Sequence, residues 1–196
     1  MKMVLTTTSF AATCALTLLA GTTSLHASDS ALWAAMADGG KAVMLQPAQT
    51  EEATPEESMH LSPAGDCTEE QSLSPEAREQ AQALGKLFDE HGVTVDVVLS
   101  SEFCRARQMA ELTFGRYETW TPLNALESLP AGESEALMAD IRDRMAVFAG
   151  EGVLVLVSHR SNIDAVTFRQ TEPGDIVVTE PHGFGGFDVL GVITQE

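Results

Sequence analysis

Residues 153–159 read VLVLVSH, and this stretch decides the fold class. Val153 to Val157 are all apolar, with no polar residue interrupting the run. A strand with one solvent-exposed face alternates apolar and polar residues, whereas a strand covered on both faces is apolar throughout. The stretch therefore predicts a central strand of a mainly parallel sheet with helices packed on both of its faces.

Strand-like and helix-like segments alternate on either side of this strand. Ser74, Pro75 and Glu76 follow the order that opens a helix, with a capping hydroxyl, a proline at the first helical position and an acid in the first turn. Gly92 is a typical stop for that helix. Further helices are expected at 30–38, 103–114 and 133–149, with a short one after 158–162 that ends at about residue 168. Further strands are expected at 41–45, 93–99, 117–120, 175–179 and 186–193.

This order of elements predicts an α/β domain. We expect a three-layer sandwich whose central sheet is mainly parallel and whose edge is antiparallel, because the last two strands are joined by a short Gly-rich turn. The chain has 196 residues, a length that suits one domain. Residues 28–196 are therefore expected to form a single domain.

The N-terminus is expected to be a cleavable export signal. Residues 10–20 read FAATCALTLLA, an apolar stretch too short for a membrane span, which needs roughly 20 apolar residues. Leu25-His26-Ala27 is an imperfect small-residue cleavage site, and residues 1–27 are interpreted as a signal peptide. The protein is then expected in the periplasm or outside the cell.

Composition excludes several classes of partner. The chain carries 11 basic residues against 29 acidic ones, a formal net charge of -18. Such a charge disfavours nucleic acid, whose phosphates require basic patches. It equally disfavours anionic lipid surfaces. No sequence feature identifies a protein partner.

Two cysteines would remain after cleavage, because Cys14 lies inside the expected signal. In an oxidising compartment, the pair Cys67 and Cys104 is expected to form a disulfide. Two unpaired buried thiols are the alternative. Metal-binding spacings such as His-x-His or Cys-x-x-Cys are missing from the sequence, and no metal or cofactor is expected.

Candidate functional residues lie where the expected parallel strands end. In open α/β sheets, ligands bind beyond the carboxyl ends of the strands. These ends are residues 46–50, 100–105 and 158–162. Arg105 falls in the first turn of a helix, where a positive charge opposes the helix dipole and is better explained by ligand binding. His159 directly follows the buried strand.

Four segments in the same order resemble the histidine phosphatase (phosphoglycerate-mutase-like) superfamily. They are GKAVMLQPAQT (40–50), CTEEQSLSPEAREQAQA (67–83), VVLSSEFCRARQMA (97–110) and VLVLVSH (153–159). The signal and the two cysteines look most like the exported bacterial branch. The resemblance implies a nucleophilic histidine that forms phosphohistidine, two arginines and a second histidine around the phosphate, and a carboxylic acid that protonates the leaving group.

The resemblance assigns roles to particular residues. Arg105 matches the second phosphate-binding arginine, His159 matches the second histidine, and Thr50 lies in the threonine position of the first motif. Glu127 is the best candidate for the acid, with Glu133 and Asp140 as alternatives.

The first motif departs from the family at two positions. Where the family has Arg-His, this chain has Gln46-Pro47, and Gln71 stands where the exported branch usually has an arginine. Proline has no nucleophilic atom, and glutamine carries no charge. We therefore expect a catalytically impaired member with a residual pocket for phosphate or a phosphorylated small molecule. The alternative is an active phosphomonoesterase that uses His159 or His60 as a substitute nucleophile.

Overall fold

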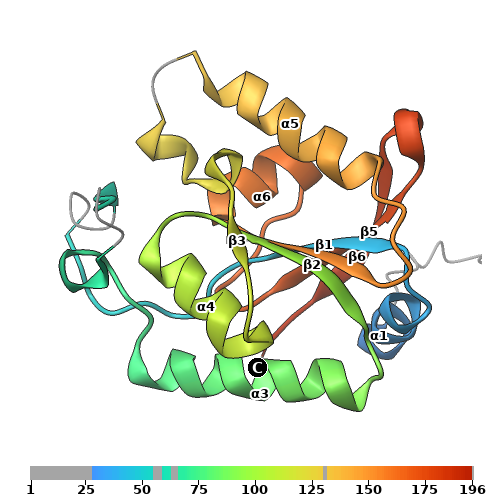
Figure 1. The fold of residues 1–196 in the computed structure, drawn as a ribbon, viewed down its shortest axis with the longest axis horizontal. Coiled ribbons are helices and arrows are strands. Elements are labelled where there is room, and N and C mark those ends of the chain that lie inside the picture. Colours follow the sequence, from blue (N-terminus) through green and yellow to red (C-terminus); the bar gives the residue numbers. More distant parts are fainter. Residues whose placement is uncertain (1–27, 55–58, 63–65, 130–131, 196) are drawn as a thin grey trace, which may run out of the picture.

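Six strands form one sheet in the computed structural model, which describes residues 28–54, 59–62, 66–129 and 132–195 (Figure 1). The strands are β1 (Lys41–Leu45), β2 (Val95–Ser100), β3 (Glu118–Thr119), β4 (Val153–Val157), β5 (Ile176–Pro181) and β6 (Phe187–Ile193). Their order across the sheet is β3-β2-β4-β1-β5-β6. The pairs β3/β2, β2/β4 and β4/β1 are parallel, and β5 and β6 add an antiparallel edge. The predicted mixed sheet is confirmed.

Helices cover both faces of the sheet. The α-helices are α1 (Asp29–Ala37), α3 (Pro75–Glu90), α4 (Cys104–Phe114), α5 (Ser134–Ala146) and α6 (Arg160–Thr167). Short 3-10 turns are η1 (Cys67–Glu69), η2 (Thr121–Leu123), η3 (Leu126–Ser128) and η4 (Gly183–Gly185). Helices α1, α3 and α4 lie below the sheet in Figure 1, and α5 and α6 lie above it. Each face has its own apolar core, so the predicted three-layer sandwich is confirmed.

The central strand β4 is buried along its whole length. All five of its residues have no exposed surface, as the uniform apolar run predicts. Alternate residues serve the two cores: Val155 packs with α1, α3 and α4, and Leu156 packs with α5 and α6. This burial fixes the end of the strand, and with it the position of His159.

The helix signals are correct for α3 and wrong in detail for α4. Ser74 caps α3, its hydroxyl accepting a hydrogen bond of 3.2 Å from the N–H of Ala77. The sequence predicts that Ser100 and Ser101 cap the next helix. Instead, α4 begins at Cys104 with Phe103 as its N-cap residue and no side-chain cap, and the Ser101 hydroxyl accepts from the N–H of Phe103 at 3.2 Å, ahead of the first turn.

The predicted disulfide between Cys67 and Cys104 is confirmed, with 5.5 Å between the two Cα atoms. It joins η1 to the first residue of α4. Arg105, the next residue, is thereby held near the chain segment that leads to α3.

The N-terminal prediction lies outside the described residues, since these begin at Ser28. Among the residues that the structure does describe, no helix has the length and apolarity required to cross a bilayer.

Candidate functional site

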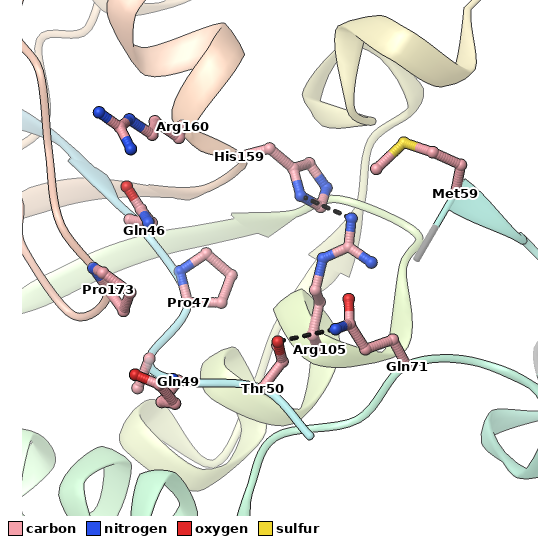
Figure 2. Close-up of a pocket in the computed structure, with 11 residues that line it drawn as sticks. Gln46, Pro47, Gln49, Thr50, Met59, Gln71, Arg105, His159, Arg160 and Pro173 are labelled. Atoms are coloured by element: carbon pink, nitrogen blue, oxygen red, sulfur yellow. Dashed lines mark hydrogen bonds between the residues drawn. The ribbon is translucent and has the colours of Figure 1, made fainter. Parts of the chain in front are cut away.

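A pocket of about 230 Å³ opens where β1 and β4 end (Figure 2). Its lining residues come from the end of β1, the segment before α3, the start of α4, the start of α6 and the loop before β5: Gln46, Pro47, Ala48, Gln49, Thr50, Met59, Gln71, Arg105, His159, Arg160 and Pro173. Gln46, Pro47, Thr50, Arg105 and His159 were all predicted as site residues. The structure brings them together at this sheet edge.

Pro47 lies buried within the pocket, between Gln46 and His159 in Figure 2. At the end of β1, the carbonyl of Leu45 accepts a hydrogen bond of 3.0 Å from the N–H of Ser158, the residue that follows β4. Proline has no N–H to continue the ladder, which a strand end tolerates. Position 47 therefore presents only an aliphatic ring to the pocket.

Gln46 is held by the loop before β5. Its side-chain oxygen accepts a hydrogen bond of 2.5 Å from the hydroxyl of Thr171, a residue that is 1% exposed. Its backbone N–H donates to the carbonyl of Asp175, and its carbonyl accepts from the N–H of Gly174. Glutamine at this position thus has a structural partner of its own, and it adds no charge to the pocket.

His159 is buried, and both of its ring nitrogens are engaged. Nε2 lies 2.8 Å from the hydroxyl of Ser101, and Nδ1 lies 3.2 Å from a guanidinium nitrogen of Arg105. Ser101 donates its proton to Oδ1 of Asn124 at 3.0 Å, so Nε2 must donate to Ser101 and Nδ1 must accept from Arg105. The Asn124 amide is itself oriented, since Oδ1 also accepts from the N–H of Glu102.

This hydrogen-bond pattern is that of a neutral imidazole. Burial, together with the positive charge of Arg105, lowers the pKa of His159 well below its usual value. The ring also packs edge-on against Phe103, with 5.1 Å between ring centroids. His159 therefore brings no positive charge to the pocket at neutral pH.

Arg105 remains charged although it is only 7% exposed. Burial lowers its pKa to about 10, while the carboxylates of Glu70 and Glu127 oppose that shift. Its guanidinium lies over the Phe103 ring, 4.5 Å from the centroid. Arg105 is thus the charged side chain that its place in the first turn of a helix predicts, and it already interacts with neighbouring groups of the protein.

Thr50 and Gln71 form one rim of the pocket. The amide nitrogen of Gln71 donates to the Thr50 hydroxyl and to the carbonyl of Glu51, both at 2.9 Å. Figure 2 shows this pair below Arg105. The Thr50 hydroxyl keeps its own proton for donation into the pocket.

The candidate acids and the second candidate nucleophile do not line the pocket. Glu127 is exposed on η3 and accepts a hydrogen bond of 2.9 Å from Ser161, although its charge still acts on Arg105. The alternatives Glu133 and Asp140 are exposed near or on α5. His60 is also exposed, and it is its neighbour Met59 that reaches the pocket.

Arg160 and Ser101 fall within the expected strand ends but have no individual role in the sequence analysis, and Asn124 is a site residue that the sequence analysis misses. Arg160 directly follows His159, so its place after the buried strand was a usable signal. Ser101 lies in the strand end 100–105, and Asn124 lies in an irregular segment with no pattern. Within the described residues, no three His, Cys, Asp or Glu side chains cluster in a way that would hold a metal ion.

Comparisons with known proteins place part of this chain near one protein family. The sequence model of the histidine phosphatase superfamily (branch 1) matches residues 64–151, a match that contains Arg105 but neither Pro47 nor His159. A search of curated proteins found no match.

Solved structures share the fold at low sequence identity. The protein histidine phosphatase SixA, complexed with tungstate, has a TM-score of 0.60 and 12% identity over 79% of this chain and 96% of its own. A phosphoserine phosphatase mutant from Entamoeba histolytica, in complex with phosphoserine, has a TM-score of 0.55 and 14% identity over 78% of this chain and 95% of its own. The mycobacterial glucosyl-3-phosphoglycerate phosphatase with VO3 has a TM-score of 0.51 and 15% identity over 77% of this chain and 97% of its own. The family match over residues 64–151 and these structures together show that the chain has a fold similar to that of histidine phosphatases.

Proposed function

We propose that this chain is an exported histidine phosphatase family protein that binds phosphate or a phosphorylated small molecule without hydrolysing it. The observation that carries the proposal is the buried ring of Pro47 in the pocket, at the position that the resemblance gives to the nucleophile. Covalent phosphoryl transfer needs an atom with a free electron pair at that position, and proline offers none. Gln46 beside it removes one of the charges that would stabilise the transferring group.

The substitute nucleophiles are poorly placed. His159 would have to give up its bond to Arg105 or to Ser101 before either ring nitrogen could attack phosphorus. An attacking atom must also come within about 3–3.5 Å of the phosphorus. His60 is exposed and does not line the pocket. Both observations favour binding without turnover.

Anion binding is supported by the polar groups that remain. Arg105, Arg160, Gln49 and Thr50 all line the pocket and can donate hydrogen bonds to an anion. The similar structures hold tungstate, VO3 or phosphoserine, which are phosphate analogues or phosphate-bearing molecules. We transfer only this general ligand class to the present chain.

Turnover decides between a binding protein and an enzyme. We expect no phosphohistidine and negligible hydrolysis of p-nitrophenyl phosphate or sugar phosphates between about pH 4 and about pH 9, because loss of a covalent nucleophile leaves only a residual acceleration of roughly 10³–10⁴-fold over water. Robust hydrolysis that disappears in His159→Ala or His60→Ala would overturn the proposal and identify the substitute nucleophile.

Restoring the motif provides the matching gain of function. The double variant Gln46→Arg with Pro47→His is expected to hydrolyse p-nitrophenyl phosphate measurably, because Arg105 and His159 already line the pocket. The nitrophenolate leaving group of this substrate departs without much help from an acid. Gln46→Arg alone is the control, since it restores the charge and leaves the proline. Equal activity in both variants would show that position 47 does not limit catalysis.

Export is tested on the protein itself. The short apolar N-terminus and the disulfide between Cys67 and Cys104 favour an oxidising compartment. N-terminal sequencing of the protein recovered from the periplasm or the medium should begin at Ser28, within a residue or two. Soluble protein that retains Met1 would contradict export.

A further inference from the structure

The positive charge of Arg105 is largely balanced within the protein. The carboxylates of Glu70 and Glu127 both act on it, and its guanidinium donates to the ring of His159. Glu70 has 1% of its side chain exposed and lies 3.8 Å from Arg107, so it is a fixed part of this charge cluster. An incoming anion therefore meets an arginine whose field is partly cancelled.

The positive charge of Arg160, unlike that of Arg105, is not balanced by a neighbouring carboxylate among the described residues. Arg160 lines the pocket on the Gln46 side of Pro47, across from Arg105 in Figure 2, and it is exposed. Among the described residues, its guanidinium forms no ion pair or side-chain hydrogen bond. It is also the first residue of α6, where a positive charge opposes the helix dipole and does not stabilise the helix.

The remaining lining contributes no further cation. His159 is neutral, and Gln46, Gln49, Thr50 and Gln71 offer only uncharged donors and acceptors. Glu51, Glu52 and Glu69 line a neighbouring cavity that shares Gln71 with this pocket. These carboxylates, and the net charge of -18, repel a doubly charged ligand more strongly than a singly charged one.

We propose that the pocket binds a singly charged phosphate ester, a phosphodiester rather than a phosphomonoester dianion, and that Arg160 supplies the cation that attracts it. The inference rests on the proposed function, and it adds the charge class of the ligand and the residue that selects it. Pro47, Met59 and Pro173 provide apolar walls for the two ester groups, which a phosphomonoester would leave half unused.

The charge class is tested with two small esters at one pH. At about pH 8, methyl phosphate is a dianion, because the second pKa of a phosphate ester is about 6, and dimethyl phosphate is a monoanion. Titration of each ester followed by backbone amide NMR shifts should show dimethyl phosphate binding at least about threefold more tightly. Binding of methyl phosphate that is equal or tighter would overturn the inference while leaving anion binding, and so the proposed function, intact. Binding of neither ester would contradict both.

The role of Arg160 is tested by a matched pair of variants. Arg160→Gln should weaken dimethyl phosphate binding by about tenfold, the effect of losing one charge-assisted hydrogen bond. Arg169→Gln removes the same charge from an exposed position that does not line the pocket, and it should leave binding unchanged. Arg160→Gln with wild-type affinity, or an equal loss in the two variants, would refute a specific contribution of Arg160.

Discussion

The chain of hydrogen bonds from Arg105 through His159 and Ser101 to Asn124 determines which charges the pocket presents. Each donor in the chain has one acceptor, so the histidine is stable only in its neutral form. A proton added to Nδ1 would face the Arg105 guanidinium and would have to be buried with no carboxylate partner among the described contacts of the ring.

This predicts a specific dependence of stability on pH. The pKa of His159 in the folded protein is well below the unfolded value of about 6.5. Between those two values the unfolded chain binds one more proton, so stability is lost as the pH falls below about 6.5, by up to about 1.4 kcal/mol per pH unit. His159→Gln keeps one donor and one acceptor but does not titrate.

The measurement is urea unfolding of both proteins between about pH 5 and about pH 8. The free energy of unfolding of His159→Gln should fall less steeply with decreasing pH than that of wild type. His60→Gln, which changes an exposed histidine outside the pocket, controls for loss of a histidine as such. Parallel pH profiles for wild type and His159→Gln would mean that His159 does not resist protonation.

Site residues could be predicted from the sequence only where a regular element fixes them. Arg105 and His159 each follow a strand of the parallel part of the sheet by a few residues, so the sheet carries both to the same end of its strands. Glu127 lies on η3, whose position depends on contacts such as the bond from the N–H of Leu126 to Asn162. Such long-range contacts leave no local pattern, which is why the role of Glu127 as the acid has no support from its position.

At the scale of elements, α3 and α4 approach each other at Gly85. A Cβ atom at that position would lie 2.4 Å from the carbonyl oxygen of Thr113, closer than atoms can pack. The same two helices form the wall behind β2, and α4 carries Arg105. Glycine inside α3 is therefore a packing requirement rather than a break in the helix.

We predict that Gly85→Ala destabilises the protein by about 1–3 kcal/mol, the usual cost of overpacking. At an open helical site the same change would stabilise by about 1 kcal/mol, so the sign itself is informative. Gln82→Ala, at an exposed position in the same helix, should change stability by less than about 0.5 kcal/mol. Thermal and urea unfolding would both detect the difference, and a stabilised Gly85→Ala would show that the helices separate at no cost.

The disulfide between η1 and α4 is the second element-scale constraint. Its cysteines lie 37 residues apart, and closing a loop of that length is worth about 3–4 kcal/mol. The variant Cys67→Ala with Cys104→Ala should lose a free energy of unfolding of that size in urea. Reduced wild type is the control, because it breaks the bond and keeps both sulfur atoms. A loss below about 1 kcal/mol in both would mean that the loop is already ordered when unfolded.

Element boundaries were predictable where capping residues mark them. Ser74 and Pro75 begin α3, and Gly92, at a φ of 69°, follows its end. Strand β2 begins at Val95 rather than at residue 93. Within its first residues the register with β4 shifts, and the Asp96 carboxylate accepts from the N–H of Gly152. A tertiary bond of this kind cannot be inferred from apolar periodicity.

At the scale of the whole molecule, the sequence predicts a mainly parallel sheet with an antiparallel edge but no strand order, and the net charge follows from the composition. Two ion pairs between oppositely charged side chains lie in the described part of the chain, Lys41–Glu180 and Arg107–Glu70, and His182 contacts Asp188 at 3.0 Å. With 29 acidic residues and 11 basic ones, most carboxylates have no cation to pair with. Repulsion between them raises the free energy of the compact state relative to the unfolded chain.

Screening that repulsion should stabilise the protein. Salt shortens the Debye length from roughly 30 Å at about 0.01 M to roughly 3 Å at about 1 M. At the higher concentration, only charges that lie close together still interact appreciably. The melting temperature at neutral pH should therefore rise with sodium chloride over this range. Near pH 4.4, the isoelectric point, the net charge vanishes and the rise should shrink or disappear, which separates screening from any general effect of the salt. A melting temperature that falls with salt at neutral pH would show that the few ion pairs outweigh the repulsion.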